Sequence, residues 1–249
     1  MLLIAVTGPP GSGKTTLLAH LADWHLARGR SVDGFLAEAG PRRTPNTGAE
    51  RYDLRWPGTG ERMPFAERDS ALRPPYRFSE EAAARTAAWS RGLADQLPVS
   101  LLVLDEFGRI EAEGRGHMAL WPSVEAAAPD VVVIAVRAGV EERIERQLGQ
   151  AFDLRVDARD PDAWQRLRSA CVEHDDWTRV GVFGAGAGGI EMTAGSALHG
   201  ARVPLRGLAL SSTQAVVMTY AGEGLGNRTR VVWVPFIAAG LKALSPAGN

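Results

Sequence analysis

Residues 8–15 read GPPGSGKT, a short stretch whose residue types and spacing suit the binding of phosphate groups. The stretch matches the pattern G-x-x-x-x-G-K-[ST] at every fixed position. Its glycines let the backbone curl tightly, so that successive amides point to phosphate oxygens. Lys14 would reach the β- and γ-phosphates, and the Thr15 hydroxyl would ligate Mg²⁺. We expect the phosphate-binding residues to be Gly8, Pro9, Pro10, Gly11, Ser12, Gly13, Lys14, Thr15 and Thr16.

A pair of acids, Asp105 and Glu106, follows the apolar run of residues 99–104. Ligands of open α/β sheets bind at the carboxyl ends of the strands, where these acids would meet the phosphate-binding loop. Asp105, the first acid, is predicted to support the coordination shell of Mg²⁺, so the expected metal residues are Thr15 and Asp105. Glu106 can polarise an attacking water as a general base, and we expect Glu106 and Lys14 to be the catalytic residues. The alternative is a solvated acidic loop after a strand.

The elements that must position these residues can be predicted from apolar periodicity. Residues 2–6 and 131–136 are uninterrupted apolar runs, and residues 99–104 (VSLLVL) form a similar run with one serine, all typical of parallel strands covered on both faces. Further strands are predicted at 32–37 and 152–156, a hairpin at 52–65, and helices at 14–28, 79–97, 117–127, 140–148 and from Asp160 onward. Strands that alternate with helices indicate an α/β fold with a mostly parallel central sheet flanked by helices.

The composition excludes several classes of protein. The 249-residue chain is 45% hydrophobic and 23% charged with a formal net charge of −1, so it is not a disordered chain. A net charge this close to zero produces no positive electrostatic field that would bind the phosphate backbone of nucleic acids nonspecifically. We therefore expect no nucleic-acid partner. The single cysteine, Cys171, cannot form an intrachain disulfide. The apolar run at the N-terminus is too short for a signal peptide, and we expect a cytoplasmic protein.

Residues 105–111, DEFGRIE, resemble the D-E-hydrophobic-G-basic-hydrophobic-E signature of a small family of P-loop nucleoside triphosphatases, the cancer-related nucleoside-triphosphatase-like group. Gly34-Phe35 followed by Glu38 is similar to the G-F-x-x-E strand of that family, and the resemblance covers about residues 1–165. It implies a P-loop NTPase fold of RecA-like type. It also implies Mg²⁺-dependent hydrolysis of nucleoside triphosphates, ATP or GTP, with little base selectivity.

Four arginines are candidates for stabilising negative charge at the γ-phosphate. Arg109 lies within the signature, with a surface salt bridge as an equal alternative. Arg137 follows a predicted strand where the resembling family more often has a histidine or another polar residue, so a sensor role for Arg137 departs from the family pattern. Arg143 and Arg146 would be arginine fingers, but their place on an amphipathic helix favours a solvated position.

Two other nucleotide-binding classes are disfavoured, and one adaptor function stays open. Residues 16–104 contain no L-S-G-G-Q-like element of a transporter ATPase, and the acid pair and the lack of an Arg-rich lid argue against a nucleotide kinase. The opening G-K-T-T-L and residues 26–32 resemble the adaptor of molybdopterin-guanine dinucleotide synthesis. The alternative function is therefore a nucleotide-sensing adaptor or regulator coupled to a membrane or biosynthetic partner.

The last 70 residues differ in composition, because residues 180–249 hold only seven charged side chains but 13 of the 28 glycines. We predict a P-loop NTPase domain over residues 1–178 and a Gly-rich, sparsely charged C-terminal module over residues 179–249. The GAGAGG stretch at 184–189 lacks an acid about 20 residues further on, so we expect a flexible, close-packing glycine turn rather than a dinucleotide site. The acidic run at 173–176 is expected to be a solvated helix terminus.

Residues 195–248 contain the blocks G-L-x-L-S-S-T-Q-A and G-L-K-A-L-S-P. With these blocks the segment resembles the opening of some integral membrane proteins related to substrate subunits of energy-coupling transporters. The uncharged segments at 207–222 and 231–241 are shorter than the roughly 20 apolar residues of a spanning helix. The basic residues beside them would suit an anionic membrane face: Arg202, Arg206, Arg228, Arg230 and Lys242. We expect either a soluble packing module or a peripheral contact with a membrane or membrane protein through residues 195–249.

Overall fold

The computed structural model describes residues 1–40, 49–72, 75–95, 98–200 and 206–243. The chain divides into two compact units, Met1–Leu167 and Arg168–Asn249. The domain boundary expected after residue 178 falls inside the long helix α5 (Ala163–Gly200) and stays a prediction. Each unit is described by itself below.

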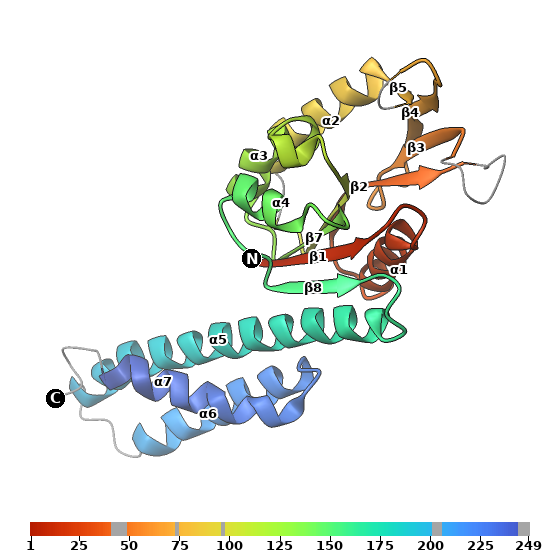
Figure 1. The fold of residues 1–249 in the computed structure, drawn as a ribbon. Coiled ribbons are helices and arrows are strands. Elements are labelled where there is room, and N and C mark those ends of the chain that lie inside the picture. The colour runs from red at the N-terminus through yellow and green to blue at the C-terminus, as the bar shows by residue number, and fades with distance from the viewer. Residues whose placement is uncertain (41–48, 73–74, 96–97, 201–205, 244–249) are drawn as a thin grey trace. The chain divides into compact units, whose positions relative to one another are not determined.

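The first unit is built on an eight-stranded sheet with the order β5-β4-β3-β2-β6-β7-β1-β8 (Figure 1). The pairs β2-β6, β6-β7, β7-β1 and β1-β8 are parallel, whereas β3, β4 and β5 extend the sheet as antiparallel strands. The strands are β1 (Leu2–Gly8), β2 (Val32–Ala39), β3 (Arg51–Arg55), β4 (Arg62–Arg68), β5 (Tyr76–Phe78), β6 (Leu101–Phe107), β7 (Val131–Arg137) and β8 (Leu154–Asp157). The mostly parallel α/β sheet and the hairpin, formed by β3 and β4, are confirmed.

Helices connect these strands, and several of their ends follow local sequence signals. The helices are α1 (Lys14–Leu26), α2 (Glu80–Leu93), α3 (Trp121–Ala127) and α4 (Glu141–Leu148), with short 3-10 turns η1 (Glu111–Glu113) and η2 (Gly116–Leu120). The Ser79 hydroxyl accepts a hydrogen bond from the amide of Ala82 and so begins α2 as predicted. Gly149, with φ 71°, ends α4 in a left-handed conformation.

The sheet of the first unit is covered on both faces. One face packs against α2, η2, α3 and α4 in a cluster that includes Phe35, Leu104 and Ile134. Leu18 and Leu21 of α1 are fully buried outside that cluster, and α1 contacts β1, β2, β6 and β7. Figure 1 shows α1 across the sheet from α2 to α4. This covering leaves the carboxyl ends of the parallel strands as the place for a ligand.

The second unit is helical. From Arg168 onward, α5 packs with α6 (Arg206–Glu223), η3 (Arg228–Val232) and α7 (Trp233–Ala243). The core of this unit contains Val180, Ala221, Leu225 and Val234. Among the described residues, none of the helices combines the length and the apolar character needed to cross a membrane.

The glycine turn expected at residues 184–189 is wrong, because these residues continue α5. A Cβ at Gly184 would lie 2.7 Å from Cβ of Ile237, and a Cβ at Gly188 would lie 3.3 Å from Cα of Ala238. Both partners belong to α7, so the glycines allow α5 and α7 to approach closely. The expected close packing is present, whereas the expected turn is replaced by helix.

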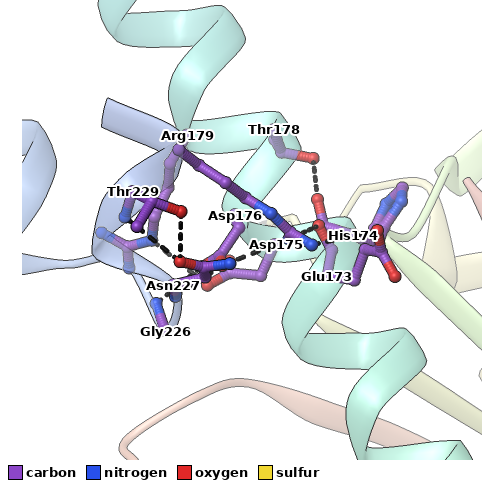
Figure 2. Close-up of polar contacts among 10 residues, drawn as sticks. Glu173, His174, Asp175, Asp176, Thr178, Arg179, Gly226, Asn227 and Thr229 are labelled. Carbon is purple, nitrogen blue, oxygen red and sulfur yellow. Dashed lines mark hydrogen bonds and ion pairs between the residues drawn. The ribbon is translucent and has the colours of Figure 1, made fainter. Parts of the chain in front are cut away.

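The solvated helix terminus expected at residues 173–176 is also wrong, because this run lies within α5. Asp176 is only 1% exposed. Its carboxylate accepts hydrogen bonds from the amides of Gly226 (2.7 Å) and Asn227 (2.9 Å), as Figure 2 shows. Arg230 adds an ion pair at 3.3 Å. The acid therefore fixes the turn that precedes η3.

Candidate active site

The glycine-rich loop joins the end of β1 at Gly8 to the start of α1 at Lys14. Gly13, with φ 93°, is the N-cap residue of α1, and no side chain caps this helix end. The first amides of α1 can therefore receive an anion. Gly8 has φ 152°, a backbone conformation that residues with a side chain rarely adopt, so the loop needs glycine at this position. All the predicted phosphate-binding residues lie in this turn or in the first turn of α1.

The Lys14 side chain folds back over the loop. Lys14 is 4% exposed, and its Nζ donates to the carbonyl oxygens of Gly8 at 3.0 Å and Pro9 at 3.2 Å. The same Nζ lies 3.7 Å from Oε2 of Glu106. The ammonium group therefore occupies the space above the loop where triphosphate oxygens would bind.

Thr15 and Asp105 connect the loop to the acid pair. The Thr15 hydroxyl donates a 2.6 Å hydrogen bond to Oδ2 of Asp105, which also accepts from the amide of Ala37 at 3.2 Å. Asp105 is fully buried, and burial raises its pKa to about 7, with the charge of Glu106 also raising it. The Thr15 hydrogen bond, the Ala37 amide and Lys14 act in the opposite direction on this pKa.

The donor atoms of Thr15 and Asp105 fit a magnesium ion. Oδ1 of Asp105 is buried and has no hydrogen-bond partner within the described part of the chain. Mg²⁺ usually takes one or two protein oxygens and completes its octahedral shell with waters and substrate phosphates. No group of three or more His, Cys, Asp or Glu side chains among the described residues could hold a metal on its own. A metal here would therefore need phosphate and water ligands, as the chemistry of Mg²⁺ allows.

Glu106 lies between two cations. Its Oε2 faces Lys14, and its Oε1 accepts a hydrogen bond from Nε of Arg137 at 3.2 Å. The Glu106 side chain is 28% exposed, so water can reach it. The register of β6 with β7 shifts between Leu104 and Phe107, so both acids stand at an irregularity of the ladder. A carboxylate that is accessible to water and held beside cations can act as a base near bound phosphate.

The other predicted arginines do not share this position. Arg109 is exposed and forms no ion pair with a described residue, so the structure does not show the alternative surface salt bridge. Arg143 and Arg146 are exposed on α4, consistent with the solvated position expected for them. The contact of Arg137 with Glu106 was not predicted. The sequence pattern that could have indicated this contact is that the apolar runs of two parallel strands are each followed by charged residues, Asp105-Glu106 in β6 and Arg137 in β7.

Two of the three comparisons with known proteins found a similar family or structure. The sequence model of a family described as NTPase matches residues 3–163. The crystal structure of THEP1 from the hyperthermophile Aquifex aeolicus is similar at 22% identity and a TM-score of 0.45, over 65% of this chain and 92% of that chain. The comparison with curated proteins gave no match.

Proposed function

The chain belongs to the NTPase family, and from this premise we propose that it hydrolyses ATP, GTP and other nucleoside triphosphates to the diphosphate and phosphate with Mg²⁺. The observation that carries the proposal is the 2.6 Å hydrogen bond from Thr15 to Asp105. Through this hydrogen bond the glycine-rich loop contacts the acid pair, which is far away in the sequence, at one edge of the sheet. A loop for phosphates beside two acids is the arrangement that cleavage of the β–γ bond requires.

Binding of the triphosphate would use the backbone first. The amides of the loop and of the first turn of α1 bind phosphate oxygens. Nζ of Lys14 would leave the carbonyl oxygens of Gly8 and Pro9 and bind oxygens of the β- and γ-phosphates. Thr15 and Asp105 would hold Mg²⁺, which supplies neutralisation of the phosphate charge when bound.

The chemical step would use Glu106 as the general base. Its carboxylate accepts a proton from a water whose oxygen attacks the γ-phosphorus. The bond from this phosphorus to the β–γ bridging oxygen breaks, and the electron pair leaves with the nucleoside diphosphate. Lys14 stays on the phosphate oxygens and offsets the charge that builds there. Each side chain named here would act at the triphosphate rather than at the nucleobase, which supports low selectivity for the nucleobase.

The test is release of phosphate from ATP, GTP, CTP and UTP, with Mg²⁺ and with EDTA. We expect all four nucleotides to turn over with Mg²⁺, and Glu106→Gln to lower kcat by about 100-fold or more. The control is Glu113→Gln, because Glu113 is 48% exposed and pairs with Arg115 rather than with the site. Equal rates for wild type and Glu106→Gln would overturn the assignment of the base.

A second candidate function is a nucleotide-dependent regulator that contacts an anionic membrane through the second unit. Ten of the fourteen exposed large hydrophobic side chains of the described chain lie in residues 168–249, and they include Trp177, Trp233 and Phe236. The contact was expected to involve Arg202, which lies outside the described residues. A chain that stays in solution with vesicles of phosphatidylserine and phosphatidylcholine contradicts this function.

A further inference from the structure

We propose that Arg137 is a positioning residue, which holds the Glu106 carboxylate beside the γ-phosphate when the triphosphate draws Lys14 away. The inference rests on the proposed function. It begins with the backbone of Arg137, the last residue of β7, which pairs in register with Gly8 of the loop. The amide of Ala138 donates to the carbonyl oxygen of Gly8 at 3.2 Å. The arginine is thus fixed next to the first residue of the phosphate-binding loop.

The side chain of Arg137 uses only part of its donor capacity on Glu106. Nε donates to Oε1 at 3.2 Å, whereas Lys14 faces the other oxygen, Oε2, at 3.7 Å. The two terminal nitrogens of the guanidinium have no hydrogen-bond partner among the described residues. The Arg137 side chain is 41% exposed, and Glu106 is its one ion-pair partner among the described residues.

A second acid nearby does not compete for Arg137. Glu111 is 6% exposed, and its two oxygens accept from the backbone amides of Gly108 at 2.8 Å and His117 at 3.2 Å. Those amides satisfy the Glu111 carboxylate. Glu106 is therefore the carboxylate to which the Arg137 side chain is bound in this structure.

The charges at the loop must rearrange when a triphosphate binds. The β- and γ-phosphates attract Lys14, so the 3.7 Å pairing of Lys14 with Glu106 weakens. The Glu106 carboxylate then stands beside a phosphate of like charge, and the two repel. The guanidinium of Arg137 is held on Oε1, the oxygen that Lys14 does not contact. Without it, Glu106 would turn away from the phosphate and from the attacking water.

The test combines Arg137→Gln and Arg137→Lys with Glu106→Gln in the full chain. We measure kcat for phosphate release at saturating ATP and, separately, the affinity for a fluorescent ATP analogue. Arg137→Gln is expected to lower kcat by about tenfold or more and to change nucleotide affinity by less than about threefold, because proton transfer depends on placement of the base. Arg137→Lys, which keeps the charge, is expected to recover part of the rate. In the Glu106→Gln background the arginine change should have almost no further effect.

The matched control is Arg155→Gln. Arg155 pairs with Glu145, its side chain is 44% exposed, and it lies on β8 away from the acid pair. Circular dichroism melting of each variant separates loss of folding from loss of function, and Arg137→Lys decides the question if Arg137→Gln does not fold. The inference is overturned if Arg137→Gln keeps the wild-type kcat, loses only nucleotide affinity, or loses as much rate in the Glu106→Gln background. A wild-type chain that releases no phosphate would instead show that the proposed function itself is wrong.

Discussion

The hydroxyl of Thr15 donates a 2.6 Å hydrogen bond to Oδ2 of the fully buried Asp105. Thr15 belongs to the first turn of α1, and Asp105 belongs to β6. The bond therefore depends on the parallel pairing that places β6 between β2 and β7 at the centre of the sheet. This hydrogen bond joins the glycine-rich loop to the acid pair, and the first two predictions follow from it.

Loss of either partner should weaken the use of Mg²⁺. We expect Thr15→Val and Asp105→Asn each to raise the Mg²⁺ concentration for half-maximal phosphate release by about 10- to 100-fold, because each removes or misplaces an oxygen donor. The control is Thr86→Val, since the Thr86 hydroxyl is buried on α2 and donates only to the carbonyl oxygens of Ala82 and Ala83. An unchanged Mg²⁺ requirement in both site variants contradicts the metal assignment.

The raised pKa of Asp105 predicts a specific dependence of stability on pH in metal-free protein. The folded-state value is about 7 against a usual 3.8, so between these values the folded chain keeps a proton that the unfolded chain has lost. Stability from this group is full below pH 3.8 and is lost as pH rises through about 7. In EDTA at pH 8, Asp105→Asn should therefore have a free energy of unfolding up to about 4 kcal/mol higher than wild type. Its melting temperature should be higher as well.

The comparison that checks this dependence is the difference in melting temperature between Asp105→Asn and wild type at pH 8 and at pH 5. We expect the difference to shrink at pH 5, because the wild-type carboxyl is then protonated in the folded chain. A difference in melting temperature of the same size at both pH values would show that ionisation of Asp105 does not lower the stability of the folded chain.

Much of the first unit could be predicted because its signals are local. The apolar runs that form β1, β6 and β7, and the cap at Ser79, need only a few neighbouring residues to be recognised. The strand β5 (Tyr76–Phe78) was not predicted, since three residues show no period and depend on pairing with β4. The acid pair and the loop were recognisable from residue types, but the contact of Arg137 with Glu106 depends on strand order.

The second unit was harder to predict because its helices depend on partners far along the chain. Gly184 and Gly188 suggest a turn when only their neighbours are considered. In the structure they pack against Ile237 and Ala238 of α7, and this packing offsets the low helix propensity of glycine. Asp176 likewise lies in a charged run, and only its contacts with residues 226–230 explain its burial.

Gly13 should be needed for nucleotide binding beyond its effect on stability. Gly13 has φ 93°, and a Cβ added at this residue would have no other atom within 4 Å, so Gly13→Ala strains only the backbone, by about 1 kcal/mol. Gly149 at φ 71° is equally open but ends α4. We expect Gly13→Ala and Gly149→Ala to lower the melting temperature alike, and only Gly13→Ala to weaken binding of a fluorescent ATP analogue. Equal affinities would show that the loop amides do not hold the phosphates.

Asp176 should stabilise the second unit far more than Glu173, although both acids contact Arg230. Asp176 is 1% exposed and accepts two backbone amides, whereas the Glu173 side chain is 59% exposed. Asp176→Ala leaves those amides and the arginine without their buried acceptor, which costs about 3 kcal/mol. Glu173→Ala removes an exposed ion pair worth less than about 1 kcal/mol. Urea unfolding of both variants measures the two costs, and similar midpoints would mean that the buried carboxylate does not hold the turn before η3.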